Sequence, residues 1–163
     1  MKTLLLSITL LTTLTTGTLA QIADAELAEE VRTEHLNLDR KDVAIGGYDP
    51  VSYFIADEPQ KGSKDITYSF KGVTYQFTSQ ENLDTFKSNP EKYEPAYGGW
   101  CAFAMGKKGS KTGANPKTYK IVDGKLFLFY NRFGINTLPK WNQEEEDLHP
   151  KANTNWEGIV SGS

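Results

Sequence analysis

The stretch Ile66-Thr67-Tyr68-Ser69-Phe70-Lys71-Gly72-Val73-Thr74-Tyr75-Gln76-Phe77 decides the fold of this 163-residue chain. Apolar and polar residues alternate on both sides of Lys71-Gly72, and such alternation is typical of half-buried β-strands. A two-residue turn that ends in glycine joins two runs of this kind into a hairpin. The sequence therefore predicts an antiparallel hairpin over residues 66–77.

Working outward, a second hairpin is predicted from residue 119 to Tyr130, because Asp123-Gly124 fits a type I′ turn between two apolar runs. Thr78 or Ser79 is expected to cap a helix that continues through Phe86. Apolar spacing predicts further helices at residues 23–37, at 133–141 and at 152–160. The fold class is therefore α+β: a small antiparallel sheet built from two β-hairpins with three to four packed helices.

The first twenty residues have the pattern of a signal peptide. Lys2 precedes a leucine-rich run, and Thr18-Leu19-Ala20 supplies small residues at a cleavage position. The apolar run is shorter than the roughly 20 residues that a membrane anchor needs. We expect a signal peptide at 1–20, a helical leader at 21–42 and one domain at 43–160. The mature protein is then periplasmic or secreted, with no stable membrane insertion.

Composition narrows the function classes. The formal net charge is −3, so the chain lacks the basic surface that nucleic-acid binding requires. Cys101 is the one cysteine, which excludes a disulfide within the chain, although export would permit one. Stability must then come from buried apolar surface, and the aromatic content of 12% is consistent with that. Nothing in the sequence indicates an oligomeric state.

Several motifs of the chain occur together in one known family. They are Tyr68 to Phe77, Ser79, Phe86 and Asn89-Pro90-Glu91-Lys92-Tyr93, then Gly47 to Phe54, Tyr97-Gly98-Gly99-Trp100-Cys101-Ala102, Ile121 to Leu126 and Asn153 to Trp156. In these motifs the chain resembles the YHS domain family, and in particular its exported bacterial members. The resemblance extends from about Val43 to Trp156.

One departure from the family bears on function. Metal-associated members of the wider family carry one cysteine directly after the aromatic residue of the strand and another four positions later. This chain has Thr78 and Asn82 at those places. Thiolate coordination is therefore missing there. The remaining candidate ligands for a closed zinc site are Cys101, His35 and His149, fewer than the four that such a site uses.

Cys101 and Met105 form the sharpest local candidate for a metal site. A thiolate and a thioether four residues apart suit a copper(I) ion. The alternative is that both are core residues, because free cysteine is among the most buried residue types and methionine fills gaps in cores. The apolar neighbours Trp100 and Phe103 favour this alternative.

Tyr48, Asp49 and Tyr97 are the candidate ligand-binding residues. Asp49 is placed to orient a ligand or hold a cation, and the tyrosines are placed to line an aromatic pocket. In the structural alternative, an Asp-Pro step closes a turn and caps a backbone amide, while the tyrosines belong to the core. The acidic run at 144–147 lacks the ligand spacing of a calcium loop, so we expect a solvated face there.

These observations predict an exported small binding protein, with its metal or ligand site near Cys101. Two alternatives stay open. One is an enzyme that uses a pocket containing Cys101, Asp49 and a histidine, although no catalytic residue is assigned. The other is a structural or interaction module without a ligand, which an exposed apolar patch would indicate.

Overall fold

The computed structural model describes residues 14–162, and the side chains of residues 21–162. The predicted signal peptide falls largely outside this part and stays a prediction. In chain order the elements are α1 (Leu14–His35), η1 (Ile45–Gly47), α2 (Ser52–Ile55), β1 (Ser63–Phe70), β2 (Val73–Phe77), α3 (Gln80–Ser88), α4 (Pro90–Tyr93), η2 (Ala96–Gly99), α5 (Ala102–Lys108), β3 (Asn115–Val122), β4 (Lys125–Phe129), β5 (Asn131–Arg132), β6 (Ile135–Asn136) and α6 (Leu138–Ser161).

Both predicted hairpins are confirmed, and so is the α+β class. Strands β1 and β2 pair antiparallel, with Tyr68 opposite Tyr75. Strands β3 and β4 pair in the same way. Both turns have positive φ at both central residues, which are Lys71-Gly72 and Asp123-Gly124. Positive φ at both positions is the type I′ geometry, which the sequence predicts for Asp123-Gly124.

A third, short hairpin was not expected from the sequence. Strands β5 and β6 pair around Phe133-Gly134, which repeats the positive-φ turn. Phe133 is 93% exposed at its tip. Among the described residues each hairpin forms a two-stranded sheet of its own, so the hairpins are joined by packing and not by one continuous ladder.

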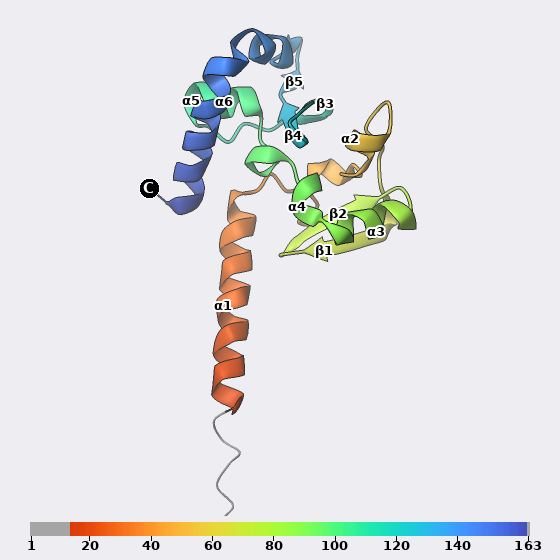
Figure 1. The fold of residues 1–163 in the computed structure, drawn as a ribbon, viewed down its shortest axis with the longest axis vertical. Helices are drawn as coiled ribbons and strands as arrows, with labels where there is room; N and C mark the ends of the chain where they lie inside the picture. The colour runs from red at the N-terminus through yellow and green to blue at the C-terminus, as the bar shows by residue number, and fades with distance from the viewer. Residues whose placement is uncertain (1–13, 163) are drawn as a thin grey trace, which may run out of the picture.

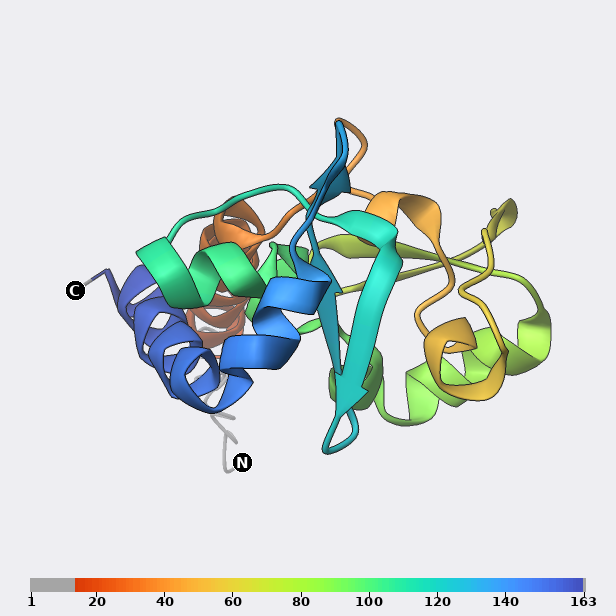
Figure 2. The same ribbon diagram turned by 90° about the horizontal axis from the view of Figure 1, so that it is seen from above.

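Strand β4 lies between two hydrophobic cores. Leu126 and Leu128 point into the core that contains β1, β2 and α3, whereas Phe127 and Phe129 point into the core that contains α5 and α6. Successive side chains of a strand point to opposite faces, so one strand can supply both cores. Figure 2 shows the β3–β4 hairpin between the two halves of the molecule.

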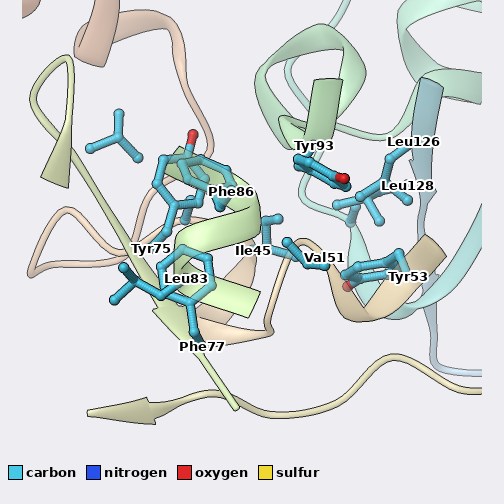
Figure 3. Close-up of a cluster of buried hydrophobic side chains, with 13 residues drawn as sticks. Ile45, Val51, Tyr53, Tyr75, Phe77, Leu83, Phe86, Tyr93, Leu126 and Leu128 are labelled. Carbon is cyan, nitrogen blue, oxygen red and sulfur yellow. The ribbon is translucent and has the colours of Figure 1, made fainter. Parts of the chain in front are cut away.

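Phe86 of α3 is the centre of the first core. Its ring is fully buried. Five other aromatic rings lie within 6.4 Å of it, those of Tyr68, Phe70, Tyr75, Phe77 and Tyr93. Figure 3 shows Phe86 with Tyr75, Phe77 and Leu83 around it. The aromatic residues that define the hairpin pattern in the sequence thus meet on one helix.

The second core is built by α5 and α6 around the fully buried Trp141. The sequence predicts separate helices at 133–141 and 152–160. Element α6 consists of helical segments on either side of Glu144, whose φ of −126° and ψ of 15° are not helical. The start of the first predicted helix is wrong, because the helix begins at Leu138 and Phe133 lies in the turn between β5 and β6. The acidic run is not simply a solvated face, because Glu144 pairs with Lys107 and Glu145 pairs with Lys120. These ion pairs tie the helix to α5 and β3.

The leader helix α1 is attached to the body at one end. Figure 1 shows it projecting from the rest of the molecule. At its C-terminal end Arg32 donates to the carbonyl oxygen of Lys71 at 2.8 Å, and the indole Nε1 of Trp100 donates to the carbonyl oxygen of His35 at 2.7 Å. Further out, Ile22 and Leu27 are exposed. No helix within residues 14–162 is long and apolar enough to cross a membrane.

Candidate functional site

Asp49 is fully buried at the turn between η1 and α2. Its Oδ1 accepts hydrogen bonds from the backbone N–H groups of Val51, at 2.9 Å, and of Ser52, at 3.3 Å. The side chain therefore caps the first turn of α2, which is the structural role that an Asp-Pro step favours. The Ser52 hydroxyl closes the same turn by donating to the carbonyl oxygen of Asp49 at 2.7 Å.

The second carboxylate oxygen of Asp49 joins two more segments. Oδ2 accepts from the backbone N–H of Thr78 at 2.9 Å, from the Thr78 hydroxyl at 2.8 Å and from Nδ2 of Asn82 at 2.7 Å. Asn82 Nδ2 also donates to Thr78 Oγ1 at 3.0 Å. One buried carboxylate thus connects the start of α2, the end of β2 and the first turn of α3.

Thr78 and Asn82 are the positions at which metal-associated YHS members carry cysteine, so this cluster is the place to test for a metal site. Its atoms are a hydroxyl, an amide and one carboxylate, and none is a soft sulfur ligand. The hydroxyl and the amide both donate toward the carboxylate. No group of three or more His, Cys, Asp or Glu suited to a metal occurs in the described part of the chain. The residues at these positions do not fit the family's metal.

Cys101 and Met105 are both fully buried. Cys101 precedes α5, and Met105 lies one turn further on. The sulfur of Cys101 accepts from the backbone N–H of Tyr130 at 3.2 Å and lies 3.4 Å from Thr137 Oγ1. The thiol is therefore integrated in the packing between α5, β4 and α6. The copper site at these two residues stays a prediction from the sequence.

The two candidate tyrosines occupy different environments. Tyr48 is stacked beneath the ammonium group of Lys61, which lies 5.0 Å from its ring centre. Tyr97 is buried in η2, and its hydroxyl donates to Asn153 Oδ1 at 2.8 Å. Burial raises the pKa of Tyr97. Of the three predicted ligand-binding residues, Tyr97 alone lines the cleft described next.

A cleft of about 740 Å³ lies between α1, η2, β4 and the C-terminal half of α6. Its walls are largely apolar, and Val31, Leu36, Phe127 and Trp156 belong to them. No local sequence pattern predicts this cleft, because its walls come from segments that are far apart in the chain. The one signal in the sequence is the apolar spacing of the helix predicted at 23–37, which puts Val31 and Leu36 near one stripe.

One end of the cleft carries a hydrogen-bonded charge pair. Arg32 of α1 forms an ion pair with Glu94. The hydroxyl of Tyr75 donates to the same carboxylate oxygen of Glu94, at 2.5 Å. Burial raises the pKa of Tyr75, and the negative charge of Glu94 raises it further. Tyr75 therefore acts as a neutral donor that helps fix the carboxylate at the foot of the leader helix.

Both histidines of the chain line this cleft. His35 Nδ1 lies 3.1 Å from Lys111 Nζ. The His149 ring packs edge-on against Phe127, with ring centres 5.1 Å apart. The sequence separates these histidines by more than a hundred positions, and the tertiary fold brings both to one cleft.

The catalytic pocket considered in the sequence analysis would need Cys101, Asp49 and a histidine within hydrogen-bond reach. In the described structure Asp49 bonds to residues of α2, β2 and α3, whereas the Cys101 sulfur bonds to Tyr130 and Thr137. No hydrogen bond among the described residues joins Asp49 to Cys101, or either of them to a histidine. The three groups belong to different local networks.

The geometry defines a small α+β protein with two cores that share β4, one buried carboxylate cluster and one apolar cleft. Residues 57–97 match the family model of the YHS domain, so the chain contains a YHS domain over these residues. The matched residues include β1, β2, α3 and α4, so they contain Thr78 and Asn82. No curated protein and no solved structure matches the chain.

Proposed function

We propose that this YHS-domain protein is an exported binding protein that holds a small, mainly apolar ligand in the cleft between α1, η2 and α6. The observation that carries this proposal is the cleft itself. Its volume of about 740 Å³ falls within the roughly 300–1,000 Å³ of small-molecule pockets. Such pockets combine apolar walls with a few polar groups that fix the ligand's orientation.

The lining indicates how a ligand would lie. Val31, Phe127 and Trp156 provide an apolar surface with two aromatic rings. His149 and Asn153 provide polar atoms near the same surface. The ring nitrogens of His149 have no hydrogen-bond partner among the described residues, and they are available to a polar group of the ligand. A flat apolar molecule with one polar end has the matching chemistry.

A fluorescent dye can test whether the cleft binds a ligand. The anionic dye 1-anilinonaphthalene-8-sulfonate is a flat apolar molecule with one polar end, and we expect its fluorescence to rise saturably on binding the wild-type protein. Val31→Trp places an indole in the cleft wall and should weaken the dye's affinity about tenfold, which corresponds to about 1.4 kcal/mol.

Leu27→Trp is the matched control for this titration. Leu27 lies one turn earlier on α1, is 59% exposed and is not part of the cleft wall. This variant should bind the dye as the wild type does. Equal weakening by both substitutions, or no saturable binding by the wild type, would refute a ligand site at the cleft.

Export is the second part of the proposal, and the leucine-rich run before Ala20 supports it. The residues of α1 that line the cleft begin at Ala28, so cleavage after Ala20 leaves the cleft intact. We expect the mature protein to begin at Gln21 when it is recovered from the exported fraction. N-terminal sequencing checks this, and an intact Met1 in that fraction would contradict it.

A metal ion is the other ligand compatible with membership of the YHS family. A soft ion at Cys101 and Met105 would have to enter a place where both side chains are fully buried. It would also compete with the backbone N–H of Tyr130 for the sulfur of Cys101. These two features favour the open cleft over the sulfur pair as the ligand site.

A further inference from the structure

We propose that the carboxylate of Asp49 takes the place of a metal ion in this chain, so that its YHS unit folds without metal. The proposal rests on a disagreement between the family pattern and the geometry. The two positions that supply thiolates in metal-associated members here supply neutral donors, and both donate to Asp49 Oδ2.

The charge at the centre of the cluster is reversed. A metal site surrounds a cation with groups that offer lone pairs, and thiolates do so with negative charge. Here the central group is an anion, and Thr78 and Asn82 turn their N–H and O–H groups toward it. The group that Thr78 and Asn82 surround is therefore supplied by the chain itself: it is the carboxylate of Asp49, 29 residues before Thr78.

The carboxylate has no capacity left for a cation. An ionised carboxylate offers about four lone-pair sites. Asp49 accepts five hydrogen bonds, two at Oδ1 and three at Oδ2. A metal ion at either oxygen would have to break one of these bonds. Among the described residues no ion pair includes Asp49, so neutral donors alone stabilise this buried charge.

For the fold, the consequence is that hydrogen bonds to one carboxylate hold three segments together. Asn82 lies in the first turn of α3, Thr78 follows β2, and Asp49 precedes α2. All three meet through one oxygen atom. A metal ion held by residues from separate segments would stabilise them in the same way, by constraining their relative positions. This chain obtains that constraint from hydrogen bonds.

The first test asks whether the melting temperature depends on a metal ion or on the carboxylate of Asp49. We expect the melting temperature of the wild-type protein to change by less than about 1 °C after EDTA treatment, or on addition of one equivalent of Zn²⁺. Asp49→Asn keeps the shape of the side chain but removes the charge and one acceptor, and should lower the melting temperature by about 8 °C. Asp57→Asn is the matched control at an exposed aspartate and should leave the melting temperature within about 1 °C of wild type.

An exchange variant separates hydrogen bonding from simple packing. The double variant Asp49→Asn with Asn82→Asp returns one carboxylate and one amide to the cluster in swapped positions. It should reverse about half of the decrease in melting temperature that Asp49→Asn causes. A role in packing alone predicts no recovery. The proposal is overturned if EDTA lowers the wild-type melting temperature by several degrees, if stoichiometric metal is lost together with that stability, or if the exchange variant melts no higher than Asp49→Asn. The EDTA comparison needs only the wild type, so it decides even if Asp49→Asn does not fold.

Discussion

Phe86→Ala is expected to lower the melting temperature of this protein by about 15 °C. The ring is fully buried, and five other aromatic rings surround it. Replacing such a phenylalanine by alanine typically costs about 3–5 kcal/mol, because apolar contacts are lost and a cavity remains. Thermal unfolding followed by near-ultraviolet circular dichroism would measure the change, and it reports on the same aromatic cluster.

Phe133→Ala is the matched control, since it makes the same chemical change at the tip of the β5–β6 hairpin. Phe133 is 93% exposed. Its φ of 54° lies in the left-handed region, where a bulky side chain has no intrinsic preference. We expect a change in melting temperature of less than about 2 °C. Similar losses in both variants would mean that Phe86 is not the centre of the first core.

Gly62→Ala is the second large expected effect, and we expect it to prevent stable folding or to lower the melting temperature by more than about 10 °C. A Cβ atom at Gly62 would lie 2.4 Å from the backbone carbon of Gln76 and 2.7 Å from the backbone nitrogen of Phe77. Both contacts are with backbone, which cannot rotate away as a side chain can. The substitution would push the end of β2 away from β1, close to the bonds that Thr78 makes with Asp49.

Gly113→Ala tests whether this effect belongs to the close approach and not to glycine as such. A Cβ atom at Gly113 meets no atom within 4 Å, and its φ is not positive. This variant should melt within about 2 °C of wild type, or slightly higher because alanine restricts the unfolded chain. If Gly62→Ala folds as stably as Gly113→Ala, the backbone of residue 62 does not approach β2 as closely as described.

The parts of the fold that sequence analysis predicted are those in which a local pattern has a local cause. Alternating residues around Lys71-Gly72 and Asp123-Gly124 specify both hairpins, because the turn geometry and the strand period agree. Ser79 caps α3 by accepting from the backbone N–H of Asn82 at 3.1 Å, as a serine before a helix predicts. Each of these features depends on residues within about ten positions of one another.

The parts that were missed depend on distant residues. The run Leu126-Phe127-Leu128-Phe129 predicts a strand, but its burial on both faces needs α5 and α6, which lie elsewhere in the chain. The kink of α6 at Glu144 lies beside ion pairs of Glu144 and Glu145 with lysines of α5 and β3. A local pattern cannot reveal such partners.

The candidate site also has one part that local sequence predicts and other parts that depend on distant residues. That Asp49 caps a turn follows from the Asp-Pro step in the sequence. Its bonds to Thr78 and Asn82 span 29 and 33 residues and could not be foreseen. No local pattern could predict the cleft, because Val31, Tyr97 and Trp156 line it together only in the folded chain.

The position of β4 limits what can be regarded as an independent unit in this chain. The residues that match the YHS model end at 97, whereas Leu126 and Leu128 close the same hydrophobic core from beyond that limit. An excised fragment with the family's boundaries would leave the rings around Phe86 open to water on that side. Because Phe127 and Phe129 tie the same strand to α5 and α6, melting of either half removes a wall of the other, and the chain should unfold in a single cooperative step.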